Sequence, residues 1–235
     1  MSPTRDSNSS KPKLVVALDV AELDEALALV DRIGDAVGWF KIGKQLFTAA
    51  GPEAVRSVHR RGRKVFLDLK FHDIPNTVAQ AVRAAAALGA EMVDVHASGG
   101  PSMLSAAARA AAESGVLLVG VTVLTSLDAA ELAAVGIQDP PEAQVLRLAR
   151  LCREHGLDGV VCSPREIRAV RAACGDDFQL VVPGIRPAGT AANDQKRIMT
   201  PAAAAAAGAG YLVIGRPITR APDPARAARE ILAGL

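Results

Sequence analysis

Eight short apolar runs recur along the chain, and most are followed by a stretch with the spacing of an amphipathic helix. The runs are 14–18, 37–42, 64–70, 92–97, 116–124, 159–162, 179–182 and 211–214. The helical stretches include 22–33, 45–61, 76–88, 101–114, 142–155 and 201–207. Several runs are apolar throughout, as parallel strands covered by helices require. This alternation predicts an α/β fold, specifically a single-domain (β/α)8 TIM barrel.

Local signals support several of these units. Ser163, Pro164 and Glu166 form the pattern of a capped helix start after the sixth run. Thr200 opens an alanine-rich helix that should end at Gly208. A doubly wound open sheet is the alternative fold, but no Gly-x-Gly-x-x-Gly turn follows the first run.

The bulk composition limits the function classes. A chain of 235 residues, half of them hydrophobic, suits one large domain, expected at 14–235. The net charge of +2, with both signs interspersed, gives no reason to expect nucleic acid as a partner. No apolar run has the length of a membrane span. Residues 1–13 are rich in Ser, Pro and Lys and predict a disordered leader.

Three cysteines are too few and too widely spaced for a zinc site or a disulfide framework; they are Cys152, Cys162 and Cys174. Cys162 lies in an apolar run, where a buried thiol is the ordinary outcome. A reducing, cytoplasmic location fits this pattern best.

The chemistry is concentrated in residues 68–77, which read Asp-Leu-Lys-Phe-His-Asp-Ile-Pro-Asn-Thr. Alternate side chains of a strand share a face, so Asp68 and Lys70 should emerge together. Asp73 comes after the expected strand end, since Pro75 prevents a simple continuation. Burying such groups is costly unless they pair or do chemistry. Taken alone, an Asp-x-Lys pair is better explained by a salt bridge that closes a strand end, and the polar groups of the other strands reverse that preference.

Other strands place polar groups at the same end, where TIM barrels have their active sites. These candidates are Asp19, Lys41, Asp94, His96, Thr125, Ser126, Pro183, Arg186, Gly215 and Arg216. Their recurrence predicts a lined pocket. We expect His96 to orient other groups rather than act as a base. Arg186, Arg216 and Gly215 match the usual phosphate site after the last two strands. The Gly-rich segment 183–197 is expected to close over a bound phosphate.

The motif Asp68-x-Lys70-x-x-Asp73-Ile74-Pro75-Asn76-Thr77 resembles the signature of the bacterial orotidine 5'-phosphate decarboxylase family. The resemblance runs from about residue 14 to the C-terminus. Its further landmarks are Val16–Asp19, Phe40–Gly43, Leu124–Ser126, Pro183–Arg186, Asp194-Gln195 and Gly215-Arg216.

The resemblance implies decarboxylation of orotidine 5'-monophosphate to uridine 5'-monophosphate, the last step of de novo pyrimidine synthesis. Lys70 would protonate C6 of the pyrimidine, with Asp68 beside the substrate carboxylate. Asp73 would come from the other subunit of a homodimer. No cofactor and no metal ion is implied.

The resemblance also implies the substrate-binding set. Asp19 and Lys41 would bind ribose hydroxyls, and Ser126 would contact the pyrimidine edge. The phosphate would be held by Gln195, Arg216 and the amide of Gly215, with Arg186 on the closing loop. The remaining expected substrate contacts are Ile74, Thr77, Thr125 and Pro183, of which Thr77 would reach the neighbouring subunit's site.

Two alternatives remain open. A sugar-phosphate decarboxylase or aldolase of the same barrel group would share Asp-x-Lys-x-x-Asp but need magnesium and an acidic residue on strand two. Lys41 stands at that place and would repel the metal. A non-catalytic nucleotide-binding barrel is the second alternative. It would not need an acid held between carboxylates, as the Asp68, Lys70 and Asp73 set implies.

Overall fold

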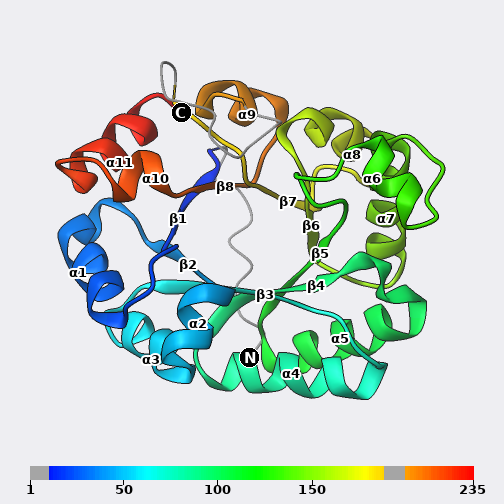
Figure 1. The fold of residues 1–235 in the computed structure, drawn as a ribbon, viewed down its shortest axis with the longest axis horizontal. Coiled ribbons are helices and arrows are strands. Elements are labelled where there is room, and N and C mark those ends of the chain that lie inside the picture. Colours follow the sequence, from blue (N-terminus) through cyan, green and yellow to red (C-terminus); the bar gives the residue numbers. More distant parts are fainter. Residues whose placement is uncertain (1–10, 188–198) are drawn as a thin grey trace.

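The computed structural model describes residues 11–187 and 199–235 of the chain. Its strands are β1 (Lys13–Ala17), β2 (Trp39–Gly43), β3 (Lys64–Phe71), β4 (Ala90–His96), β5 (Leu117–Val121), β6 (Gly159–Val161), β7 (Gln179–Val182) and β8 (Tyr211–Ile214). Each strand pairs in parallel with its neighbours in chain order, and β8 pairs with β1 to close the barrel (Figure 1). The predicted TIM barrel is confirmed.

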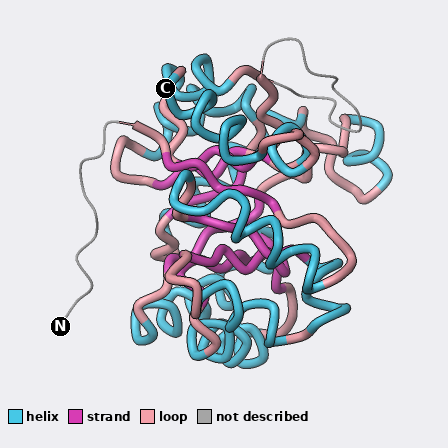
Figure 2. Tube along the Cα trace, turned by 90° about the vertical axis from the view of Figure 1, so that its left-hand side faces the viewer, coloured by secondary structure: helices cyan, strands magenta, loops and turns pink. Residues whose placement is uncertain are grey.

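The helices form an outer ring around the strands (Figures 1 and 2). They are α1 (Leu23–Ile33), α2 (Lys44–Ala50), α3 (Pro52–His59), α4 (Pro75–Ala87), α5 (Gly100–Ser114), α6 (Ala129–Ala134), α7 (Pro141–Glu154), α8 (Ile167–Cys174), α9 (Pro201–Ala207), α10 (Arg216–Thr219) and α11 (Pro224–Ala233). Short 3-10 turns lie at Gly34–Ala36, Ala97–Gly99 and Pro164–Glu166. Within the described residues, no helix combines the length and the apolar character needed to cross a bilayer.

Alternation along the strands divides the buried residues into two cores. The larger core fills the layer between strands and helices, where Phe40 and Ile42 point outward from β2. The smaller core fills the barrel interior and comprises Val15, Ala17, Trp39, Phe66, Met92, Val119, Val181, Tyr211 and Val213. The barrel interior is therefore packed with side chains up to the C-terminal ends of the strands, where the expected site lies.

The structure corrects three expectations. The single helix expected at 45–61 is two helices, α2 and α3. Gly51 between them has a φ of 61°, and Pro52 opens the second helix. The stretch between β5 and α7, where no helix was predicted, contains α6, which Asp128 caps. β5 ends at Val121, before the expected 124, because its neighbour β6 has only three residues to pair with it.

Other boundaries agree closely with the sequence. Ser163 and Glu166 form the expected capping box, and the Thr200 side chain accepts the Ala203 N–H at 3.3 Å. β1 starts at Lys13, one residue before the expected start of the barrel. Most of the predicted leader, residues 1–10, lies outside the described residues, as does the 188–198 part of the predicted closing segment.

Candidate active site

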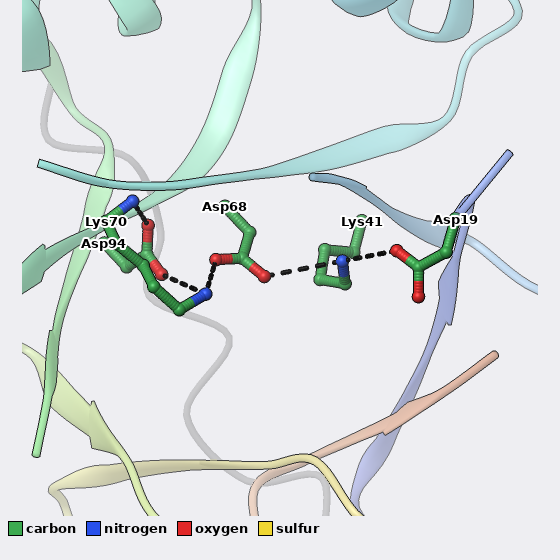
Figure 3. Close-up of polar contacts among 5 residues, drawn as sticks. All are labelled: Asp19, Lys41, Asp68, Lys70 and Asp94. Carbon is green, nitrogen blue, oxygen red and sulfur yellow. Dashed lines mark hydrogen bonds and ion pairs between the residues drawn. The ribbon is translucent and has the colours of Figure 1, made fainter. Parts of the chain in front are cut away.

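Five ionisable side chains, alternately acidic and basic, form a continuous row across the C-terminal ends of the first four strands (Figure 3). Asp19 follows β1, Lys41 lies on β2, Asp68 and Lys70 lie on β3, and Asp94 lies on β4. Lys41 Nζ is 2.9 Å from Asp19 Oδ1 and 3.4 Å from Asp68 Oδ2. The ammonium group of Lys41 thus links the first two carboxylates of the row.

Lys70 continues the row on the other side of Asp68. Its Nζ donates to Asp68 Oδ1 and lies 3.8 Å from Asp94 Oδ2. The Lys70 side chain remains 24% exposed, whereas that of Asp94 is 1% exposed. Lys70 is therefore held between two carboxylates but still accessible from the mouth of the barrel.

Asp68 and Lys70 meet, as expected. The expected cause, simple alternation along a regular strand, is wrong. β3 pairs with β4 through Leu67 and Val93, and next through Phe71 and Val95. Three residues of β3 therefore lie opposite one residue of β4, which is a bulge. Lys70 within it has a φ of 54°, the only positive φ of a non-glycine residue in the described chain. The bulge changes the direction of the Lys70 side chain at the strand end.

Electrostatics determine the ionisation of the row. Burial by itself would raise the pKa of Asp68, but Lys41 and Lys70 outweigh it and hold that pKa well below its ordinary value. Burial would lower the pKa of Lys41, yet Asp68 and Asp19 raise it. Asp94 behaves oppositely, because burial and then the Asp68 carboxylate raise its pKa well above the ordinary value. The two carboxyl groups beside Lys70 therefore differ, because Asp68 ionises more readily than an ordinary aspartate and Asp94 less readily.

Two cavities open beside this row, and both are lined by Lys41, Asp68, Lys70 and Leu124. The outer cavity has a volume of 310 Å³ and also contacts Asp19, Lys44 and Gln45. The inner cavity, of 160 Å³, reaches into the barrel and is mainly apolar, with Thr125 and Pro183 among its lining residues. A charged outer cavity above an apolar inner cavity suits a ligand with one polar part and one flat apolar part.

The β7–β8 side supplies two guanidinium groups. Arg186 is buried, and its Nη1 donates to the Ile185 carbonyl oxygen at 3.0 Å. Its Nε has no hydrogen-bond partner among the described residues. Burial, and next the charge on Arg216, lowers the pKa of Arg186. The two guanidinium groups repel one another, and a bound anion would reduce that repulsion.

Gly215 joins this arginine pair to the charged row. It precedes Arg216, and a Cβ placed on it would lie 3.6 Å from Asp19 Oδ2. The start of α10 therefore lies next to the Asp19 end of the row.

Several predicted site residues do not join the row within one chain. Asp73, Ile74 and Thr77 are exposed at the start of α4, and Asp73 accepts the Ile74 N–H at 2.6 Å. Among the described residues, the ion pairs of Lys70 are with Asp68 and Asp94, not with Asp73. Ser126 is exposed in the loop after β5. Gln195 lies outside the described residues.

His96 and Asp94 lie on the same face of β4, as their spacing indicated. The ring centroid of His96 is 5.4 Å from that of His72. Burial and then the charge on His72 lower the pKa of His96. The sequence indicated the position of Asp94 but not its hydrogen bond. Its Oδ1 accepts the backbone N–H of Lys70 on β3, and no sequence pattern reveals that bond.

Comparison with known proteins identifies the family of the chain. The model of the orotidine 5'-phosphate decarboxylase / HUMPS family matches residues 12–231. The chain belongs to this family. The orotidine 5'-phosphate decarboxylase of Moorella thermoacetica is 58% identical over 234 residues, covering 96% of this chain and 93% of that protein. The Haemophilus influenzae (strain PittEE) protein of the same name is 55% identical over 93% of this chain and 96% of its own.

Solved structures agree with the family assignment. The crystal structure of orotidine 5'-phosphate decarboxylase from Lactobacillus acidophilus superimposes with a TM-score of 0.85 at 37% identity, over 95% of this chain and 98% of that one. The family resemblance seen in the 68–77 motif is confirmed. The names of these relatives give the predicted enzyme class, a carboxy-lyase.

Proposed function

We propose that this chain decarboxylates orotidine 5'-monophosphate to uridine 5'-monophosphate. The observation that carries the proposal is the Lys70 ammonium group, paired with Asp68 at the mouth of the cavity. The names of the family members support it. A cation beside an ionised carboxylate is suited to a reaction in which one negative charge leaves and another develops.

The reaction requires a charge-stabilising proton donor. When the bond between C6 and the carboxyl carbon breaks, carbon dioxide departs and the electron pair stays on C6. Lys70 would stabilise that charge and deliver the proton that forms the C6–H bond. The chain's own groups supply each of these steps, so we propose that no metal ion and no organic cofactor takes part.

Asp68 would lie beside the substrate carboxylate. Its position is fixed by Lys41 on one side and Lys70 on the other. Because both lysines keep it ionised, it would orient the Lys70 ammonium group through their ion pair. Lys41 has a second role in this scheme, since with Asp19 it would bind the ribose hydroxyls.

The phosphate would lie on the β7–β8 side, held by Arg186, Arg216, Gly215 and Gln195. The buried Nε of Arg186 and the repulsion between the two guanidinium groups favour an anion there. The base would enter the inner cavity beside Thr125, Ser126 and Pro183. The phosphate lies far from the reacting carbon, so its binding energy can position the substrate.

A homodimer completes the proposed site. Asp73 and Thr77 are exposed, and Ile74 between them is 67% exposed. We propose that these three residues contact the partner's site. Mixing Lys70→Ala subunits with Asp73→Ala subunits should then restore part of the activity, because each mixed dimer regenerates one intact site. Activity of the mixture no greater than that of the separate variants would contradict a shared site.

A direct assay tests the activity itself. The decrease in absorbance on adding orotidine 5'-monophosphate should be the same with EDTA as without it. Activity that depends on magnesium would favour the sugar-phosphate alternative. The position of Lys41 argues against that alternative, since its ammonium group occupies the space between Asp19 and Asp68. Tight binding of uridine 5'-monophosphate without turnover would instead favour a nucleotide sensor.

A further inference from the structure

Asp94 is the one β4 residue opposite the bulge of β3. Between the pairs Leu67–Val93 and Phe71–Val95, β4 contributes only Asp94. A bulge interrupts the regular ladder of backbone hydrogen bonds. Here the Asp94 side chain replaces a backbone acceptor, because its Oδ1 accepts the Lys70 N–H at 2.8 Å. This bond reaches the residue whose φ is 54°.

We propose that Asp94 is a positioning residue, which holds the β3 bulge in the conformation that directs the Lys70 ammonium group onto Asp68. The proposal rests on the proposed decarboxylation for its kinetic consequences, but its structural part does not. A positive φ is unfavourable for a non-glycine residue and persists only where the surroundings enforce it. The hydrogen bond from Lys70 N to a fully buried carboxyl group is such a constraint.

The environment of Asp94 favours its neutral, protonated form. Its pKa is raised by burial first and by Asp68 second, while Lys70 opposes the shift. Asp94 Oδ2 is buried, lies 3.8 Å from Lys70 Nζ and has no hydrogen-bond partner among the described residues. The hydrogen bond that supports the bulge is the one that Asp94 Oδ1 accepts from the Lys70 amide, and the side-chain oxygen of an asparagine could accept the same bond.

The charged groups around Asp94 are few. Asp68 and Lys70 face it from β3, and Lys41 on β2 lies beyond Asp68. Val119 is its partner on β5, and His96 follows two residues along β4. As the pH rises through the elevated pKa of Asp94, its ionisation would place a second negative charge against Asp68. The pair would separate, and the bulge would lose its support.

The test compares Asp94→Asn with Asp94→Ala. Asparagine keeps an oxygen that accepts the Lys70 N–H and should leave kcat near that of the wild type at neutral pH. Alanine should lower kcat roughly 10²-fold with little change in KM, because the proton donor is misplaced but binding groups remain. Asp94→Asn should also stay active at higher pH than the wild type, because it cannot ionise.

A matched control is Asp158→Ala. Asp158 Oδ2 likewise accepts a backbone N–H from the neighbouring strand, that of Leu118 at 2.9 Å, but at the opposite end of the barrel. Its loss should lower stability without changing kcat. Hydrogen exchange of the Lys70 amide should accelerate in Asp94→Ala, and not in Asp94→Asn or Asp158→Ala.

Full kcat in Asp94→Ala, or unchanged exchange of its Lys70 amide, would overturn the positioning role. Equal losses of kcat in Asp94→Asn and Asp94→Ala would overturn it as well. Identical pH profiles for the wild type and Asp94→Asn would overturn the neutral-acid assignment. Absence of turnover in the wild type would instead refute the proposed decarboxylation. The exchange measurement would then still decide the structural part.

Discussion

The two ends of the barrel interior use lysine in opposite ways. At the N-terminal end, Trp39 meets Tyr211 edge-to-face, with ring centroids 5.4 Å apart. Lys64 Nζ lies 5.6 Å from the Trp39 ring centroid, and Lys13 Nζ lies 5.6 Å from that of Tyr211. At the C-terminal end, Lys41 and Lys70 lie among carboxylates instead. Cations cover aromatic rings at one end and hold an ionic row together at the other.

One strand shows how the difference arises. Trp39 and Lys41 are two residues apart on β2 and therefore share its inward face. Trp39 is buried among apolar groups and contributes stability through the area that it removes from water. Lys41 is buried as a charge, which is costly and is offset by Asp19 and Asp68. We infer that the N-terminal end mainly stabilises the barrel, whereas the C-terminal end is organised for chemistry.

The largest effect should follow from breaking the ionic row. Lys70→Ala should lower kcat by at least roughly 10⁴-fold, because the variant loses both the proton donor and the nearest cation. Binding of uridine 5'-monophosphate should persist, since the arginine pair is untouched. Steady-state kinetics and calorimetric titration measure the two quantities. Lys64→Ala, at the other end of the same strand, is the matched control and should keep normal kcat.

Substantial activity in Lys70→Ala would show that another group protonates C6. A similar loss of kcat in Lys64→Ala would contradict the division of the barrel into two ends. Both variants need a check of folding by circular dichroism, so that a loss of structure is not mistaken for a loss of chemistry.

Removing the buried Trp39 ring should have the opposite effect, a loss of stability without a loss of kcat. Trp39→Ala should lower the free energy of unfolding by about 3–5 kcal/mol, the usual cost of truncating a buried aromatic residue. Trp39→Phe keeps a ring and should cost less. Urea unfolding measures both. In the folded fraction, kcat should stay within a few-fold of the wild type, and a kcat loss as large as that of Lys70→Ala would refute the comparison.

The sequence predicted the C-terminal end better than the N-terminal end. Asp19, Lys41 and Asp68 could be placed together because parallel strands in a barrel all end on the same face. The bulge at Lys70 could not be predicted, since it depends on a hydrogen bond to β4 rather than on local pattern. The contact between Trp39 and Tyr211 was missed for a similar reason. It joins β2 to β8 in the interior. Alternation along each strand predicts that each ring points inward, but not which ring it contacts.

The smallest expected effect concerns the cation over Trp39. Lys64→Met keeps an unbranched apolar side chain but removes the charge, and should lower the free energy of unfolding by about 0.5–1 kcal/mol, the usual strength of an exposed cation–π contact. A double-mutant cycle isolates this term, because Lys64→Met should then have almost no effect in a Trp39→Ala background. An equal effect in both backgrounds would show that Lys64 stabilises the barrel through other contacts. Lys64 would then resemble Lys70 in depending on polar partners, and the two lysines would differ only in their location in the barrel.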